Sequence, residues 1–564
     1  RVDLIGEDNK IAFDRELAPP AGVARLRRGA CVTFKRPAAV LPALGLSLLA
    51  VVYLATVLPD LGNDPIIGGD EGWIMSASAR LARDGIFGSE LFTGFHGADR
   101  NYFFNLPLHH ILLAGIFKVI GTGVFEARLL SVGFGLLTLG LTYALGRRIG
   151  GEVVGIGAAA LLVLLRLNLA PFSGLTLTDL GATVRYDLIA VPFALGATLL
   201  IAARPHDPSL PRVAVAGLLV ELGGLTQFIG AFFLFPLALF LLTITSLSPR
   251  RRLTLTAAFG LAATLPLLIY AVFALVHWDD FRGQSRAVDQ ETNFLSPAFY
   301  IDQIRHEPDR YAIGAGLESL PTSPGELASR PSARLVLLVV APLAVAYSVV
   351  RARAGSPLHR LLALLLLGLA LEFTLFESTK RYVYIVALVP LLCIAIADLG
   401  LALWRSPSRY ALPALAVRGV VVLSLCLFAV EGAAVAARDV RDASSAPDYA
   451  ALTTELEATI PAGATVIADN RLWAALRHRQ PRSLLLLFYF TNQKMMRDEV
   501  TNIPGAFERI DADYLLLSPL SREDLTELSP ADAADFERHL VERAELVTTV
   551  DFPDYGPIEV YRLR

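Results

Sequence analysis

The sequence predicts a polytopic α-helical membrane protein of about eleven transmembrane helices with a C-terminal extracytoplasmic α/β domain. Of its 564 residues, 54% are hydrophobic and 18% are charged, whereas a soluble domain has about a quarter of its residues charged. The excess lies in apolar runs such as "PAAVLPALGLSLLAVVYLATVL" and "LLALLLLGLALEFTLF". A run of about 20 apolar residues spans a bilayer. Because such runs recur between residues 37 and 432, they favour a membrane protein over a soluble protein with buried helices.

The first apolar run does not resemble a cleavable signal sequence. A long polar segment precedes it, and no small-x-small cleavage site follows it. The run is therefore expected to be the first membrane span.

The three cysteines, Cys31, Cys393 and Cys426, form no disulfide framework and no pair with metal-ligand spacing.

Basic residues between the apolar runs set the expected orientation. Short loops rich in Lys and Arg stay in the cytoplasm, so an even number of crossings separates each basic cluster from the next. The requirement for an even number of crossings decides how two ambiguous regions are read. Residues 106–121 are read as a re-entrant or interfacial helix, because they number only about 16. Residues 213–245 are read as two short helices that break near Gly223 and Gly224. The six basic clusters are Arg25, Arg27, Arg28, Lys35 and Arg36; Arg147 and Arg148; Arg204 and Arg212; Arg250, Arg251 and Arg252; Arg351, Arg353 and Arg360; and Arg405 and Arg409.

These assignments divide the chain into three parts. Residues 1–36 form a cytoplasmic N-terminal segment, residues 37–432 a transmembrane domain with external loops 60–125 and 277–333, and residues 433–564 a soluble extracytoplasmic domain. The protein is therefore expected in the plasma membrane. The expected spans are residues 37–58, 126–146, 152–170, 185–203, 212–224, 226–246, 253–276, 334–350, 359–376, 381–403 and 410–432.

The C-terminal part changes in composition. "GATVIADN", "ADYLLLS" and "AELVTTVDF…GPIEVYRLR" are rich in residues that favour strands, while "YAALTTELEATI" and "REDLTELSPADAADFERHL" favour helices with polar faces. Strands alternating with helices indicate a small α/β domain. From Asp439 onward there are 22 acidic and 13 basic residues. This net charge of −9, against −3 for the whole chain, fits a solvated external domain.

Carboxylates gather at the predicted outer face. Asp70 and Glu71 follow two glycines and begin the helical pattern "WIMSASARLARDG", and Arg185 and Asp187 begin the fourth span. Ionisable groups at membrane depth are costly and tend to be functional. Spacing alone leaves a second interpretation open, since acids at a helix start also interact favourably with the helix dipole.

Four segments in this order resemble the polytopic GT-C glycosyltransferases, in particular the protein O-mannosyltransferase-like and aminoarabinose-transferase-like branch. They are "GGDEGWIMSASARLARDGIF", "FNLPLHHILLAGIFKVIGTGVFEARLLSVGFGLLTLGLTYALGRRIGG", "VRYDLIAVPFALGATLLIA" and "TKRYVYIVALVPLLCIAIA". The resemblance covers essentially the whole membrane part. It implies a polyprenyl-phosphate sugar donor, an acceptor that approaches from outside, and a catalytic carboxylate in the first external loop.

The resemblance assigns roles to the outer residues. Asp70 is expected to be the base, Glu71 to position the acceptor or bind a metal, and Asp187 to orient the acceptor or a metal, with Arg185 balancing its charge. His277, in "ALVHWDD", matches a metal-binding histidine of the aminoarabinose branch, so a divalent metal is a possible cofactor. A structural role for this histidine is the alternative.

The phosphate of the donor is expected to meet cations at the mouth of the tenth span. Lys380 and Arg381 lie there, followed by Tyr382 and Tyr384. The alternative interpretation is an interfacial anchor with an aromatic belt.

The chain also departs from the family pattern. Many relatives carry Glu-Lys-Pro-Pro before the short apolar segment, where this chain reads "FFNLPLHH", and Gln227 stands where a lysine is common. Three explanations stay open: the donor differs, activity is lost, or phosphate binding has moved to His109, Arg100 or Arg282.

The resulting prediction is a membrane enzyme that transfers a sugar from a polyprenyl-phosphate donor to an acceptor lipid, glycan or protein. Its expected partners also include membrane lipids, but not nucleic acid. A transporter or flippase, and a non-catalytic assembly subunit, are the alternatives. The sequence shows no internal repeat of the transporter type and no P-loop. Nucleotide sugars are cytoplasmic, so the outward-facing acids disfavour them as donors.

Overall fold

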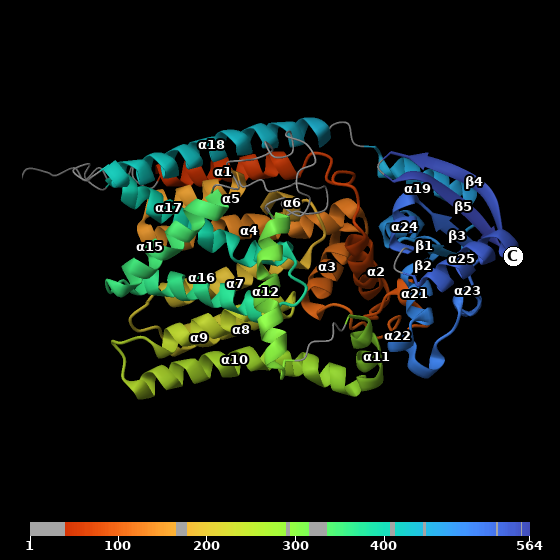
Figure 1. Cartoon of the computed structure of the whole chain (residues 1–564), viewed down its shortest axis with the longest axis horizontal. Helices are drawn as coiled ribbons and strands as arrows, with labels where there is room; N and C mark the ends of the chain where they lie inside the picture. The colour runs from red at the N-terminus through yellow and green to blue at the C-terminus, as the bar shows by residue number, and fades with distance from the viewer. Residues whose placement is uncertain are drawn as a thin grey trace, which may run out of the picture.

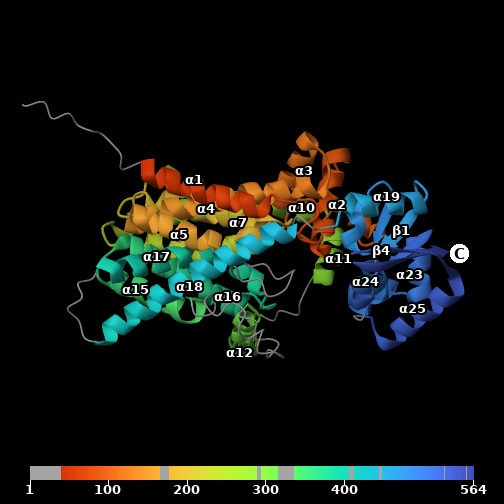
Figure 2. The same ribbon diagram turned by 90° about the horizontal axis from the view of Figure 1, so that it is seen from above.

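A computed structural model of the chain describes residues 40–164, 177–288, 294–314, 336–405, 412–443, 447–525, 528–553 and 555–564. A long body of helices runs along the long axis of the molecule, and the C-terminal domain lies at one end of this body (Figures 1 and 2). The connections between α9 and α10 and between α15 and α16 lie at the opposite end (Figure 1).

Each of the eleven predicted spans contains a helical segment. Five of these segments are long and apolar enough to cross a membrane, by length and composition, so the number of crossings stays a prediction. The segments are α1 (Val40–Val57), α4 (Val124–Gly150), α5 (Glu152–Leu164), α7 (Tyr186–Ala202), α8 (Leu210–Gly224), η2 (Phe228–Phe233) with α9 (Leu234–Leu242), α10 (Pro249–Val276), η3 (Val336–Val340) with α15 (Ala341–Arg353), α16 (Pro357–Phe376), η4 (Tyr382–Ala387) with α17 (Val389–Arg405), and α18 (Leu412–Ala443).

The structure breaks the helix of residues 213–245 where the glycine pair predicted it. Helix α8 ends at Gly224, and η2 begins at Phe228. The two segments come into backbone contact, because a Cβ atom on Gly230 would lie 2.3 Å from the carbonyl carbon of Gly223. Only glycine allows so close an approach. The last helix differs from its prediction, since α18 continues eleven residues beyond the expected end of the span at residue 432.

Shorter helices occupy the predicted external loops. They are α2 (Gly69–Asp84), η1 (Glu90–Phe92), α3 (Pro107–Ile120), α11 (Trp278–Val288) and α12 (Pro297–Gly314), and α6 (Leu177–Gly181) precedes α7. Helices α2 and α3 lie between the body and the C-terminal domain, while α12 stands across the direction of the body helices (Figure 1). The 14-residue α3 covers the segment for which an interfacial or re-entrant helix was predicted.

The C-terminal domain is a mixed five-stranded sheet of order β2-β1-β3-β5-β4 with helices around it. Strands β1, β2 and β3 are parallel, and β4 and β5 pair antiparallel. The sequence prediction missed β2 because it contains Pro481, which lacks a backbone donor and is tolerated at the edge of a sheet. The elements are α19 (Tyr449–Thr459), β1 (Thr465–Ala468), η5 (Asn470–Leu472), α20 (Trp473–Leu476), β2 (Gln480–Ser483), α21 (Leu485–Thr491), α22 (Gln493–Met496), η6 (Arg497–Glu499), α23 (Ile503–Ile510), β3 (Tyr514–Leu517), α24 (Pro519–Asp524), α25 (Pro530–Arg543), β4 (Ala544–Phe552) and β5 (Gly556–Leu563).

A shared core joins the C-terminal domain to the first external loop. Buried apolar residues of both regions form one cluster, separate from the cluster inside the helical body. At its centre, Phe92 lies with its ring 4.8 Å from those of Trp73 and Phe104, and Tyr489 stacks 6.1 Å from Phe92. Each such aromatic pair contributes roughly 0.5–1.5 kcal/mol beyond area burial. Helix α2 is therefore held between the body and the C-terminal domain.

Candidate active site

The first turn of α2 presents its two acids in different surroundings. Adjacent residues of an α-helix point about 100° apart, because there are 3.6 residues per turn. The Asp70 side chain is 46% exposed, whereas that of Glu71 is 3% exposed. The positive end of the helix dipole favours both carboxylates, so the difference between their environments comes from their neighbours.

Glu71 is satisfied by donors from three parts of the chain. Nε and Nη2 of Arg128, on α4, donate to its two oxygens at 2.9 and 2.8 Å. The backbone N–H groups of Gly68 and Val184 donate at 2.9 and 2.7 Å. This carboxylate ties together the start of α2, helix α4 and the segment before α7. The position expected for an acceptor or metal ligand is thus surrounded by protein donors.

Arg185 links the other two predicted acids. Its Nη1 donates to Oδ2 of Asp70 at 2.7 Å, and its Nε and Nη2 lie 2.9 and 2.8 Å from Oδ2 of Asp187. The other oxygen of Asp187 accepts a 3.1 Å hydrogen bond from Gln227. The Asp187 side chain has no exposed surface. The structure therefore brings Asp70, Arg185 and Asp187 together, with Asp70 as the accessible end of the group.

His109 lies behind this group rather than at an open surface. Its ring is 6.2 Å from the ring of Tyr186, and the guanidinium carbon of Arg185 lies 5.6 Å from the same tyrosine ring. Burial, and then the proximity of His110 and Arg185, hold the pKa of His109 well below its usual value. His109 is therefore neutral at pH 7 and offers no charge to a phosphate in this conformation.

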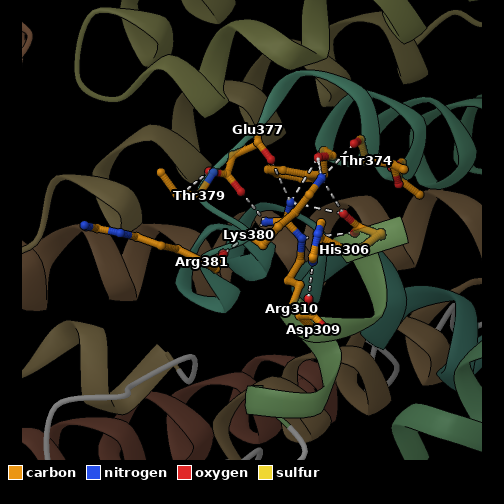
Figure 3. A network of polar contacts seen from close by, with 11 residues as sticks. His306, Asp309, Arg310, Thr374, Glu377, Thr379, Lys380 and Arg381 are labelled. Carbon is orange, nitrogen blue, oxygen red and sulfur yellow. Dashed lines mark hydrogen bonds and ion pairs between the residues drawn. The ribbon is translucent and has the colours of Figure 1, made fainter. Parts of the chain in front are cut away.

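Lys380 points into a buried ionic network instead of toward the exterior (Figure 3). Its ammonium group donates to Glu307 at 3.0 Å and to the carbonyl of Thr374 at 2.7 Å. Burial lowers the pKa of Lys380, and the hydrogen bond to Glu307 partly offsets this effect. The expectation that Lys380 meets the donor phosphate is not supported by this placement.

Arg381 extends in the opposite direction and is exposed (Figure 3). Within the described part of the chain, its guanidinium has no hydrogen-bonding or ion-pair partner. The phenol of Tyr384 lies within electrostatic reach of Asp187, Arg381 and Arg185, so this arginine belongs to the surroundings of the acidic site. The side chain of Tyr382 lies outside the described residues.

The remaining predicted residues do not join this site. His277 follows α10, and its ring lies 5.1 Å from that of Phe273. Arg282 is exposed on α11, and Arg100 is exposed in the first external loop. Over the described ranges, no three His, Cys, Asp or Glu side chains are grouped to hold a metal ion, so no step of the chemistry is assigned to one.

Sequence reasoning missed two supporting residues. Arg128 was the more detectable, because it is a charged side chain inside a predicted span, where charges rarely occur without a function. Gln227 was noted only as the replacement of a common lysine, and its hydrogen bond to Asp187 had no signal in the sequence.

Fold and site define a multi-pass membrane protein with an acid–arginine site where its helical body meets a C-terminal α/β domain. Residues 105–270 match the family model described as Dolichyl-phosphate-mannose-protein mannosyltransferase. No curated protein matches the sequence of the chain. The family match indicates a membrane glycosyltransferase of the type that uses a lipid-linked sugar donor.

Solved structures share the fold. ArnT from Cupriavidus metallidurans in the apo state has 15% sequence identity and a TM-score of 0.55, over 93% of this chain and 98% of that one. The same protein bound to undecaprenyl phosphate has a TM-score of 0.54 at 15% identity, over the same shares of the two chains. The oligosaccharyltransferase AglB from Archaeoglobus fulgidus, in complex with an inhibitory peptide and a dolichol-phosphate, has 12% identity and a TM-score of 0.54, over 92% of this chain and 74% of that one. The family match therefore confirms the predicted resemblance to the GT-C glycosyltransferases, and these structures agree with it in fold.

Proposed function

We propose that this protein transfers a sugar from a polyprenyl-phosphate donor to an acceptor on the extracytoplasmic side of the membrane, with Asp70 as the general base. The exposure of Asp70 carries this assignment. Glu71 and Asp187 are buried, and both have their oxygens occupied by protein donors. Asp70 accepts from Arg185 through Oδ2, which leaves Oδ1 for the acceptor.

The proposed reaction needs one base and one cation. The hydroxyl or amine of the acceptor attacks the anomeric carbon of the sugar and gives its proton to Asp70. The bond between that carbon and the phosphate oxygen breaks, and the electron pair leaves with the polyprenyl phosphate. Arg381, exposed and without a protein partner over the described ranges, pairs with the phosphate both in the bound donor and in the leaving group, so its charge contributes chiefly to donor binding.

Asp187 and Glu71 support the base from behind. Asp187 and Gln227 fix Arg185, which in turn orients Asp70. Glu71 fixes the start of α2 through Arg128. Both acids are thus assigned to positioning rather than to contact with the acceptor. A lipid phosphate as the donor's leaving group agrees with the ArnT and AglB structures, which hold undecaprenyl phosphate and a dolichol-phosphate, respectively.

The test compares Asp70→Asn with Asp84→Asn, a partly exposed acid at the other end of the same helix. Each variant is reconstituted in proteoliposomes with a panel of undecaprenyl- and dolichyl-phosphate sugars and an extract of cell-envelope acceptors. Loss of a general base lowers the rate by about 10²–10⁴-fold, so release of free polyprenyl phosphate should nearly stop in Asp70→Asn and continue in Asp84→Asn. Near-normal turnover of Asp70→Asn refutes the assignment of the base.

A further inference from the structure

Helix α12 is joined to the segment between α16 and η4 by a buried network of two acids and two bases (Figure 3). Arg310, with no exposed side-chain surface, lies 3.0 Å from Glu307 and 2.7 Å from Glu377. Lys380 lies 3.0 Å from Glu307. The formal charges of the four groups cancel, so removal of one member leaves an uncompensated buried charge.

The buried face of α12 is polar, which is unusual for a helix docked on a helical body. Gln303, Glu307 and Arg310 are buried, at spacings of four and three residues that place them on one face. Ile301 and Ile304 are exposed. An amphipathic helix ordinarily buries its apolar side chains. Because buried ion pairs contribute little net stability compared with apolar packing, this contact is better suited to fixing a geometry than to strengthening the fold.

The geometry that Arg310 fixes is that of the backbone around residues 373–381. Its Nη2 donates to the carbonyl of Phe373 at 2.9 Å, and its Nη1 donates to the carbonyl of Arg381 at 3.0 Å. A guanidinium carries five N–H donors in a rigid fork, so this single side chain spans both ends of the segment.

Lys380 completes this arrangement through its backbone conformation. Its φ of 53° lies in the left-handed region, which residues other than glycine seldom adopt. The network holds the ammonium group of Lys380, and the turn sends the side chain of Arg381 the other way (Figure 3). The orientation of Arg381 therefore depends on contacts made by α12.

We propose that Glu307 and Arg310 of α12 are positioning residues for the lipid-phosphate site, because they lock residues 377–381 so that Arg381 faces the donor. This inference rests on the proposed function. A cation that is already oriented loses less conformational freedom when the phosphate binds, so the network acts on donor affinity through Arg381.

The test separates positioning from stability with a charge-balanced variant. Arg310→Met with Glu377→Gln removes one acid and one base, leaves Glu307 paired with Lys380, and releases the carbonyl of Arg381. Arg310→Lys keeps the charge but loses the fork. Asp309→Asn, on the exposed face of α12, is the matched control. Each variant in nanodiscs is measured for the Kd of undecaprenyl phosphate, for kcat at saturating donor and for its thermal midpoint.

The charge-balanced variant should bind undecaprenyl phosphate about tenfold more weakly, with kcat changed less than threefold. Arg310→Lys should show a smaller loss, and Asp309→Asn none. Arg381→Ala should weaken binding to a similar extent, and adding the Arg310 and Glu377 changes to it should have no further effect. A Kd within threefold of the unaltered protein, or losses that multiply in the combined variant, overturns the inference. If the unaltered protein itself fails to bind undecaprenyl phosphate, this inference fails together with that donor assignment.

Discussion

Glu71 and Arg128, 57 residues apart in the chain, form a two-pronged ion pair with almost no exposed surface. Nε and Nη2 of the arginine lie 2.9 and 2.8 Å from the two carboxylate oxygens. The pair fastens the first turn of α2 to helix α4. It thereby gives two neighbouring acids different surroundings, since Asp70 stays exposed while Glu71 is held inside.

We expect Glu71→Gln to act on stability before it acts on chemistry. The substitution leaves Arg128 charged and buried, and breaking a buried pair in this way costs about 3–5 kcal/mol. Thermal unfolding in detergent should show a large decrease in the midpoint. Glu71→Gln combined with Arg128→Met removes both charges and should recover part of the loss. A Glu71→Gln protein with normal stability and no transfer would return Glu71 to the catalytic groups.

Hydropathy was sufficient to predict the helical segments of the body, because the thickness of a membrane limits helix length. The glycines at residues 223 and 224 were sufficient to predict the break between α8 and η2, because they mark a close backbone contact. The predicted membrane topology placed Asp70, Arg185 and Asp187 on the same side of the membrane, and the structure brings these three residues into contact. The direction of individual side chains was not predictable. Which acid of the Asp70–Glu71 pair stays exposed depends on the rotation of α2 against α4, and the inward turn of Lys380 depends on a positive φ that lysine rarely adopts.

Cysteine labelling should test the predicted orientation of the chain. The exposed Arg100 lies in the first external loop, and the exposed Arg353 lies in a predicted cytoplasmic connection. In a background without the three native cysteines, a membrane-impermeant maleimide added to intact cells should label Arg100→Cys but not Arg353→Cys. Permeabilisation should then expose the second site. Labelling of Arg353→Cys in intact cells contradicts the orientation derived from the basic loops.

The contact between α2 and the C-terminal domain should be sensitive to a single methyl group. A Cβ atom on Gly72 would lie 1.7 Å from the carbonyl oxygen of Asn470, so Gly72→Ala must displace η5 from the helix that carries Asp70. Overpacking of this kind costs about 1–3 kcal/mol, and transfer should fall together with the thermal midpoint.

Gly115→Ala on α3 is the control for Gly72→Ala. Nothing lies within 4 Å of its added methyl group, so the higher helix propensity of alanine should raise stability by up to about 1 kcal/mol. Equal behaviour of the two variants contradicts a tight contact at Gly72.

His110 should make the stability of the protein depend on pH below neutrality. Burial lowers the pKa of His110 to about 4, against about 6.5 in an unfolded chain. Between these values the unfolded chain binds a proton that the folded protein does not, so stability decreases as the pH falls. The slope approaches about 1.4 kcal/mol per pH unit between the two pKa values, and the total loss between pH 7.5 and pH 5 is about 2 kcal/mol. As the pH is lowered from 7.5 to 5, the thermal midpoint should therefore fall in the unaltered protein and fall less in His110→Asn.

His306→Asn is the control for His110→Asn. This exposed histidine pairs with acids that raise its pKa, which is an effect of opposite sign. An unchanged pH dependence in His110→Asn would show that His110 takes up its proton in the folded protein, and that burial does not keep it neutral.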